Sequence, residues 1–250
     1  MQQSNKYIII FTLIMTIIVG GLLALANQLL KPAQTKSIEL DTKRQILSAV
    51  MEVGKKDDVL GIYEKRIRSI VVDINGEEVS TDEKGQPIEA EKIDVAKYFK
   101  VDYKKRLFPV FKYVNENNPD KVDAYILPVY GSGLWDRIWG FVALDEELKK
   151  IKGVSFGHKG ETPGLGARIT EKDIQQRYVG KDIYNTTGQF VSVEMQKGEN
   201  GGGEASIQAY IDKPNQVDGM SGATLTGRGV NDMLRKYLDY YQKYIKKNRK

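Results

Sequence analysis

The segment Asp218–Ile245, with the sequence DGMSGATLTGRGVNDMLRKYLDYYQKYI, decides how this chain folds. Its second half carries apolar residues at steps of three and four, which predicts a long amphipathic helix with one buried face. That face contains Val230, Met233, Leu234, Tyr237, Leu238, Tyr241, Tyr244 and Ile245. Tyrosines at this spacing are typical of core packing, so we expect the helix to lie against a β-sheet.

Upstream of this helix the chain has short β-prone runs, separated by clusters of Asn, Gly, Asp and Lys. The runs are Phe108–Val114, Ala124–Tyr130, Trp139–Leu144, Ile151–Phe156, Phe190–Gln196 and Ala205–Ile211. Apolar residues on both sides of Asn75-Gly76 predict a β-hairpin. Because strands follow strands without regular helical crossovers, the fold class predicted is α+β, with a mostly antiparallel sheet flanked by helices.

Three shorter helices are also expected. The first carries Ile46, Leu47, Val50 and Met51, with Asp41 or Thr42 as its cap. A second periodic run contains Val59, Leu60, Tyr63 and Ile67. The third begins with Thr170 as its cap and ends near Gly180.

The N-terminal region has the composition of a membrane anchor. No residue between Tyr7 and Leu30 is charged, and at about 1.5 Å per residue such a helix spans a bilayer core of roughly 30 Å. The predicted organisation is a tail over 1–6, a transmembrane anchor over 7–30 and a soluble domain over 31–250. A cleaved signal peptide is the alternative, because Ala24-Leu25-Ala26 has the small-x-small form of a cleavage site.

Composition limits the chemistry that the chain can perform. The net charge of the 250 residues is +5, but the tail from Arg235 onward holds seven basic residues and one acidic residue, so the remainder is nearly neutral. Nucleic acid is therefore not an expected partner. With no cysteine and a single histidine, His158, the chain excludes iron–sulfur clusters, disulfides and thiolate chemistry. We expect no metal site and no catalytic residue, so redox chemistry would need an organic cofactor.

Three glycine-rich segments could hold such a cofactor: Tyr130–Trp135, Gly157–Arg168 and Asp218–Gly229. The third precedes a helix start, whose free N–H groups attract an anion such as phosphate. It does not have the Gly-Lys-Ser/Thr ending of a P-loop. The residues by themselves leave another explanation for each segment. Tyr130–Trp135 could place a tryptophan in the core, Gly157–Arg168 could be a solvated loop, and Asp218–Gly229 could be a turn with ordinary helix caps.

Together these segments resemble the covalent FMN-binding subunits, the C subunits, of the Na+-translocating NADH:quinone oxidoreductases. HKGETPGLGA, residues 158–167, and YGSGLW, residues 130–135, are similar to two signature loops of that family. DGMSGATLT, residues 218–226, resembles its flavinylation motif, Asp-x-x-Ser/Thr-Gly-Ala-Thr/Ser. In that motif a flavin transferase links FMN through its phosphate to the last hydroxyl residue.

The resemblance implies that FMN is attached covalently to Thr224. It also implies that the transferase needs Asp218, and that the turn presenting the acceptor is formed by Ser221, Gly222 and Ala223. Thr226 is the competing hydroxyl, and the motif rather than geometry favours Thr224. From the other two loops, the resemblance implies flavin contacts by Leu134, Trp135, Glu161, Thr162, Gly164, Leu165 and Gly166.

The function implied is electron transfer within a membrane complex that oxidises NADH, reduces quinone and exports Na+. The implied partners are five further subunits, A, B, D, E and F, together with the flavin transferase and the bacterial inner membrane, with the FMN domain on the periplasmic side. The G subunit of the Rnf ferredoxin:NAD+ oxidoreductases shares the motif and the anchor, but the substantial region before Tyr130 favours the quinone reductase. A membrane-anchored binding module without covalent cofactor is the third hypothesis.

Overall fold

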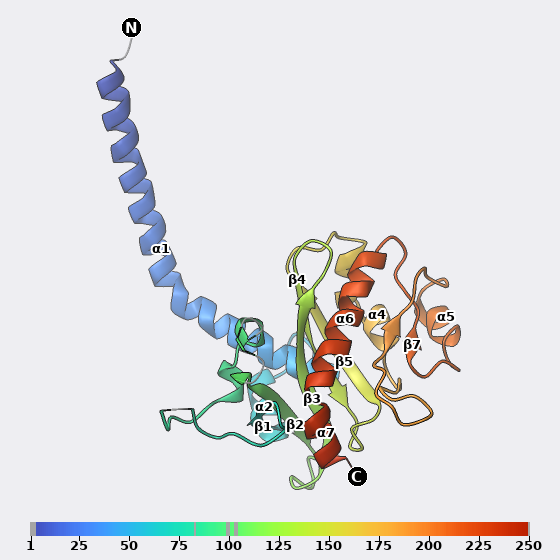
Figure 1. Cartoon of the computed structure of the whole chain (residues 1–250). Helices are drawn as coiled ribbons and strands as arrows, with labels where there is room; N and C mark the ends of the chain where they lie inside the picture. Colours follow the sequence, from blue (N-terminus) through green and yellow to red (C-terminus); the bar gives the residue numbers. More distant parts are fainter. Residues whose placement is uncertain (1–3, 83, 99–100, 103–104, 250) are drawn as a thin grey trace. The chain divides into compact units, whose positions relative to one another are not determined.

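The computed structural model describes residues 4–82, 84–98, 101–102 and 105–249. In chain order its elements are α1 (Asn5–Ser48), α2 (Val59–Arg66), β1 (Ile67–Val72), η1 (Ala90–Lys92), α3 (Val95–Tyr98), β2 (Phe108–Val114), β3 (Val122–Ser132), β4 (Arg137–Leu144), β5 (Ile151–His158), η3 (Gly166–Thr170), α4 (Lys172–Gln176), β6 (Glu194–Met195), α5 (Gly203–Gln208), β7 (Gln216–Val217), α6 (Thr224–Tyr240) and α7 (Gln242–Asn248). Figure 1 shows their arrangement.

The chain divides into two compact units, Met1–Lys43 and Arg44–Lys250. The first consists of most of α1, which is long and apolar enough to cross a membrane. The expected second helix start at Asp41 or Thr42 is wrong, because α1 continues through Pro32 to Ser48 and the Thr42 hydroxyl donates to the Ile38 carbonyl instead of capping. Good helix formers after Pro32 outweigh the hydrogen bond that the proline removes.

The second unit is built on a five-stranded antiparallel sheet with strand order β1-β2-β3-β4-β5, so each strand pairs with the next in sequence. The expected α+β class with a mostly antiparallel sheet flanked by helices is confirmed. Four of the expected runs become β2, β3, β4 and β5. Apolar β-branched and aromatic side chains on both faces of these strands explain why they need cover on both sides.

Helices cover the two faces of the sheet separately. Along β4, Ile138, Val142 and Leu144 belong to a core that includes the buried face of α6, whereas Phe141 and Ala143 belong to a second core. This alternation is the period of two that a strand imposes. The second core also contains Ile46 and Leu47 from the end of α1 and residues of α2. In Figure 1, α6 runs along the sheet in front of β3 and β4.

The eight residues expected on the buried face of the C-terminal helix are all buried, which confirms that face as core. The helix itself is interrupted: α6 ends at Tyr240 and α7 begins at Gln242. Tyr241 between them remains buried, and its hydroxyl donates to the Pro109 carbonyl of β2. Aromatic packing between Phe108 and Tyr241, with ring centroids 5.5 Å apart, joins the helix end to the same strand.

Three local predictions are wrong. Ala205–Ile211 is not a strand, because most of it lies in α5, where three successive glycines with positive φ, Gly201 to Gly203, let the chain turn into a helix. Only Glu194–Met195 of the run Phe190–Gln196 is a strand. Thr170 does not cap α4, since its hydroxyl donates to Ala167 within η3.

The Asn75-Gly76 turn forms as expected, but it joins no pair of long strands. The Asp73 carboxylate accepts hydrogen bonds from the Asn75 and Glu77 backbone N–H groups and so fixes the turn. Past the turn, only the bridge between Val72 and Glu78 continues the hairpin. β1 pairs with β2 instead, from which some 35 intervening residues separate it.

Candidate functional site

All three glycine-rich segments meet at the first turn of α6. A cavity of about 200 Å³ opens there, and its lining comes from the β3–β4 turn, the loop after β5 and the start of α6. The lining residues are Leu134, Glu161, Thr162, Leu165, Gly166, Gly222, Ala223, Thr224, Leu225 and Thr226. Nine of these ten were expected to contact a cofactor, and Leu225 was not. The structure therefore brings most of the predicted site residues together.

Glu161 connects the three segments. It is 4% exposed, and its carboxylate accepts hydrogen bonds from the Trp135 N–H at 2.9 Å and the Thr226 hydroxyl at 2.5 Å. Burial by itself would raise the pKa of Glu161, but these bonds and those from the Leu134 and Asp136 N–H groups lower it below its usual value. Glu161 is therefore an ionised carboxylate that holds the turn after β3 and the first turn of α6 in one arrangement.

The same contact separates the two candidate hydroxyls. Thr226 is 1% exposed and its hydroxyl is engaged by Glu161, with Gly166 packed so closely that a Cβ there would overlap the Thr226 Oγ1. Thr224 is only half-buried and lines the cavity. Both threonines line the cavity, but only Thr226 is buried and bonded through its hydroxyl to Glu161. The two threonines therefore differ in burial and in the bonding of the Thr226 hydroxyl.

The start of α6 offers an anion site beside Thr224. The first N–H groups of a helix have no partner within the helix, and the N-cap residue Ala223 carries no side-chain acceptor for them. The helix dipole adds a partial positive charge at this end. Among the described residues, neither Lys nor Arg lines the cavity. A phosphate group here would thus be held by backbone N–H groups and not by a cationic side chain.

The remaining expected residues lie around the cavity and not in its lining. Trp135 is 70% exposed, and its indole N–H donates to the Thr162 hydroxyl over 3.1 Å. Gly164 has a φ of +72° and permits the turn between Thr162 and Leu165. Ser221 is exposed. Asp218 is fully buried and accepts hydrogen bonds from Asn200 and Ser206, so its carboxylate does not face the cavity.

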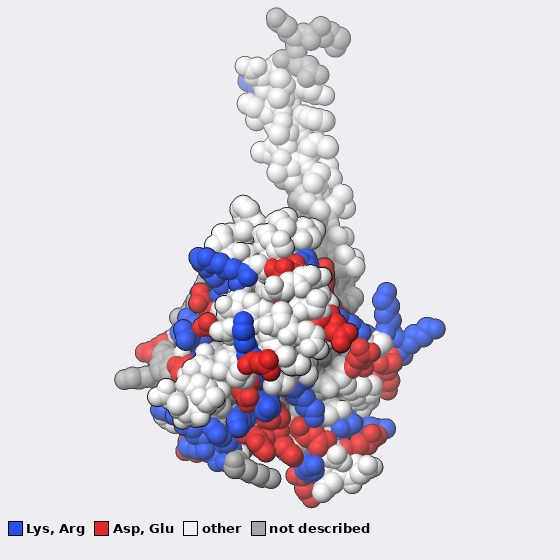
Figure 2. Space-filling model, turned by 90° about the vertical axis from the view of Figure 1, so that its right-hand side faces the viewer, with Lys and Arg blue, Asp and Glu red and all other residues white. Residues whose placement is uncertain are grey.

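Apolar side chains surround the cavity mouth. Leu134, Trp135, Leu165 and Leu225 are each at least 41% exposed. Figure 2 shows that the upper end of the globular unit on the face in view is largely uncharged, while acidic and basic side chains are most numerous in its lower part. Large exposed apolar residues gathered at one place are typical of a surface that binds a ligand or a partner.

Sequence reasoning missed an acidic residue behind this site, Glu199. Its carboxylate accepts hydrogen bonds from both terminal nitrogens of Arg168, at 2.7 and 2.8 Å, from Arg177 at 2.8 Å and from the Ser221 N–H at 3.1 Å. The hydrogen bonds from Arg168 contribute most to lowering the pKa of Glu199 from 4.5 to about 2. An acidic residue in a polar, glycine-rich stretch gives no signal in the sequence that could have identified it.

We expect Glu199 to make the fold acid-labile. Its pKa is lower in the folded chain than in the unfolded chain, so its contribution is complete above pH 4.5 and is lost as the pH falls toward 2. The shift corresponds to at most about 3 kcal/mol in the free energy of unfolding. Urea unfolding at pH 7, 4.5 and 3 measures it. Glu199→Gln should flatten the curve over this range, and equal slopes for both chains would contradict the assignment.

Known proteins resemble this chain both in the region of the cavity and over most of its length. Residues 133–239 match the family model of the FMN-binding domain. The C subunit of the Na+-translocating NADH-quinone reductase of Haemophilus ducreyi is 30% identical over 94% of this chain and 91% of its own length, and that of Pseudomonas aeruginosa is 32% identical over 95% and 92%. The crystal structure of the C subunit from Parabacteroides distasonis is 31% identical and superposes with a TM-score of 0.69, covering 86% of this chain and 96% of that one.

Proposed function

Since this chain belongs to the family of C subunits of Na+-translocating NADH-quinone reductases, we propose that it is an FMN-carrying electron-transfer subunit of such a complex. We further propose that FMN is bound covalently, by a phosphoester to Thr224. The complex would oxidise NADH, reduce quinone and export Na+, and this chain would be one redox station in it. The relatives are subunits of quinone reductases, which favours this assignment over membership of a ferredoxin:NAD+ oxidoreductase.

The observation that carries the proposal is the position of Thr224. It is the first residue of α6, it lines the cavity, and the helix N–H groups beside it suit the phosphate of FMN. When bound, FMN accepts and donates electrons one or two at a time. The chain's own residues supply attachment at Thr224, a fixed carboxylate at Glu161 and apolar contact area at the cavity mouth. Through packing and nearby charge such residues set the potential of a flavin.

Attachment through the phosphate suits a cavity without cationic side chains. A dissociable phosphate cofactor is usually held by Arg or Lys, or by a dedicated phosphate loop. Here an ester bond would replace that binding energy, while the flavin ring itself stays chemically unmodified. Gly222, with a φ of +72°, shapes the turn that leads into Thr224.

Intact-protein mass and peptide mapping test the proposal on chain expressed in its native host, where a flavin transferase is present. The expected result is an added FMN less one water, localised to the peptide that contains Thr224. An unmodified mass from transferase-competent cells would contradict covalent attachment and favour an anchored binding module.

We propose that Leu134, Trp135, Glu161, Thr162, Gly164, Leu165 and Gly166 form the flavin's surroundings. Trp135→Phe, which also removes the indole N–H bonded to Thr162, is expected to shift the visible flavin absorption and the midpoint potential. Trp139→Phe is the matched control, because Trp139 bonds to Gln45 outside the cavity lining. Absorption spectra and redox titration of the two variants decide the point, and identical values for Trp135→Phe and the wild type would sink the assignment.

The proposed location is the bacterial inner membrane, with one crossing by the apolar part of α1 and the second unit on the periplasmic side. The proposed partners are the other five subunits, A, B, D, E and F, and the flavin transferase. The lysines that follow the apolar segment are a weak indicator of orientation, since long domains translocate largely regardless of such charges. A reporter fused after Lys250 should be active on the periplasmic side, and activity confined to the cytoplasm would contradict this orientation.

A further inference from the structure

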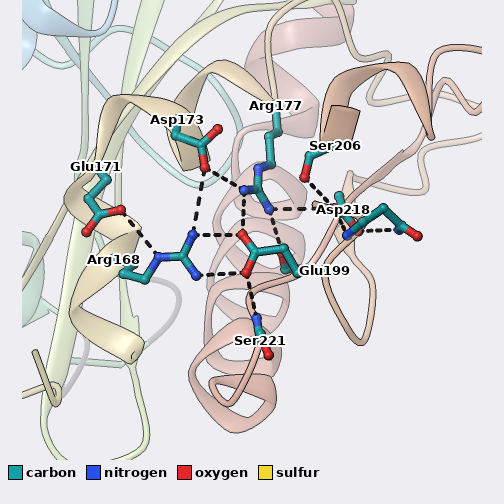
Figure 3. Close-up of polar contacts among 10 residues, drawn as sticks. Arg168, Glu171, Asp173, Arg177, Glu199, Ser206, Asp218 and Ser221 are labelled. Atoms are coloured by element: carbon teal, nitrogen blue, oxygen red, sulfur yellow. Dashed lines mark hydrogen bonds and ion pairs between the residues drawn. The ribbon is translucent and has the colours of Figure 1, made fainter. Parts of the chain in front are cut away.

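Next to residues 218–223, which lead into Thr224 and are called the acceptor segment below, two arginines converge on one carboxylate (Figure 3). Arg168, from η3, forms a two-pronged pair with Glu199, and Arg177, just after α4, donates to the same carboxylate over 2.8 Å. The Glu199 side chain is 11% exposed and that of Arg177 is 1% exposed. Two-pronged, charge-assisted hydrogen bonds fix direction as well as distance. Glu199 is thereby held in one orientation.

This cluster holds the acceptor segment, residues 218–223, at several points. The Arg177 guanidinium donates to the Gly219 carbonyl over 2.5 Å and to Asp173 over 2.6 Å. The Ser221 N–H donates to the Glu199 carboxylate on the other side. Gly219 is therefore attached to Arg177 and Ser221 to Glu199, and these two charged residues bond to each other.

Asp218 supplies a third attachment, on the side of α5. Its carboxylate accepts hydrogen bonds from the Asn200 N–H at 2.7 Å, from the Asn200 side chain at 2.8 Å and from the Ser206 hydroxyl at 2.5 Å. Gly219 next to it has no room for a Cβ, which would overlap the Gln196 and Gly198 carbonyl oxygens. The acceptor segment is thus fixed from outside by Arg177 and Glu199, and from within by the Asp218 side chain.

We propose that Glu199 and Arg177 are positioning residues for flavin attachment, which hold residues 218–223 in the conformation that presents Thr224 to the flavin transferase. This inference rests on the proposed function, since it concerns the reaction at Thr224. Neither Glu199 nor Arg177 lines the cavity that Thr224 lines. Their effect passes through the backbone of the acceptor segment.

Joining FMN to a hydroxyl with release of water would be unfavourable in water, so the donor must contain a phosphoanhydride, as flavin adenine dinucleotide does. The Thr224 oxygen forms a bond to the phosphorus on the flavin side, the bond from that phosphorus to the bridging oxygen breaks, AMP leaves, and the hydroxyl proton passes to a base or to solvent. No electron is gained or lost. In-line attack of this kind depends on alignment, so the transferase must bind residues 218–223 in the one conformation that points the Thr224 hydroxyl at the donor.

Preorganisation accounts for why charged groups outside the cavity matter here. A segment that is already ordered when the transferase binds does not have to be ordered at that moment. If the competent conformation is populated only in part, the apparent affinity falls by that fraction. Losing Glu199 would leave Arg177 with one fewer carboxylate and the Ser221 N–H without its acceptor, and the acceptor segment would then sample other conformations.

The test uses the full-length chain, purified in detergent from cells without the transferase and then supplied with flavin adenine dinucleotide and purified transferase. Initial rates of covalent flavin incorporation, read by in-gel fluorescence and mass, are measured against the concentration of the acceptor chain. We expect Glu199→Ala to raise the KM for the acceptor chain about tenfold while kcat changes by less than about twofold. Amide exchange of the peptide containing Ser221 should become faster in the same variant. Glu204→Ala, at an exposed position in the first turn of α5, is the matched control.

Glu199→Gln keeps the volume of the side chain and one acceptor oxygen, so it should lie between the wild type and Glu199→Ala. It decides the question where the alanine variant does not fold, as judged by circular dichroism and thermal unfolding in the assay buffer. A folded Glu199 variant with the KM and amide exchange of the wild type would overturn this inference and leave the proposed function intact. A wild-type chain that active transferase leaves unmodified would instead contradict the proposed function.

Discussion

Thr224→Ala is expected to abolish covalent flavin completely. The alanine has no oxygen to form the phosphoester, and the neighbouring Thr226 hydroxyl cannot replace it because Thr226 is buried and bonded to Glu161. The fold should survive, since Thr224 is half-buried at a helix start and replacing a threonine there costs no more than about 1 kcal/mol. Intact mass should show the bare chain, and the yellow colour should be lost on denaturing gels.

Two control variants sharpen this prediction. Thr224→Ser keeps a hydroxyl at the same backbone position and should still receive the flavin. Thr226→Val removes the neighbouring hydroxyl and should leave the modified residue unchanged, although it breaks the bond to Glu161. Flavin found on Thr226 in the Thr224→Ala chain, or flavin lost from Thr226→Val chain that is folded, would contradict the assignment of the acceptor.

The second large effect is expected for Glu161→Ala, which should destabilise the fold by about 3–5 kcal/mol. The change removes the acceptor of the Trp135 backbone N–H and of the Thr226 hydroxyl. It also leaves a cavity under the Gly133 and Gly166 backbones. An unsatisfied buried donor costs about 1–3 kcal/mol, and two or more are created here. Urea unfolding at pH 7 measures the loss.

Glu161→Gln separates the charge from the hydrogen bonds. The amide oxygen can still accept one bond and the side-chain volume is unchanged, so a smaller loss of about 1–2 kcal/mol is expected. Glu147→Ala, at an exposed turn position, should be nearly neutral. Should Glu161→Ala unfold at the same urea concentration as Glu147→Ala, Glu161 would not be the residue that joins the three glycine-rich segments.

The sheet and the buried face of α6 were predictable because their signals are local and periodic. Phe108–Val114 is a run of β-prone residues, and Val230 to Ile245 repeats at helical spacing, so each pattern determines its own element. The run Ala205–Ile211 is apolar enough to resemble a strand, but its structure is set by the three glycines before it and by the Ser206 bond to Asp218. Such tertiary contacts override local propensity.

The candidate site was predictable in its parts but not in its connections. The three glycine-rich segments were recognisable from composition and from their resemblance to known motifs. Sequence spacing could not show that Glu161 reaches Thr226 across 65 positions, and therefore could not exclude Thr226 on physical grounds. Glu199 and Arg177 were missed altogether, because a residue that supports a loop from behind belongs to no motif of that loop.

The small size of the cavity beside Thr224 has a consequence for how tightly the flavin needs to bind. At about 200 Å³ it is below the roughly 300–1,000 Å³ of pockets that enclose a free ligand. A tethered ring is confined near its site at an effective concentration in the millimolar range, so even weak contacts keep it docked. With FMN attached as proposed, the chain would not lose its cofactor by dilution, and part of the ring could stay uncovered for a partner that exchanges electrons with it.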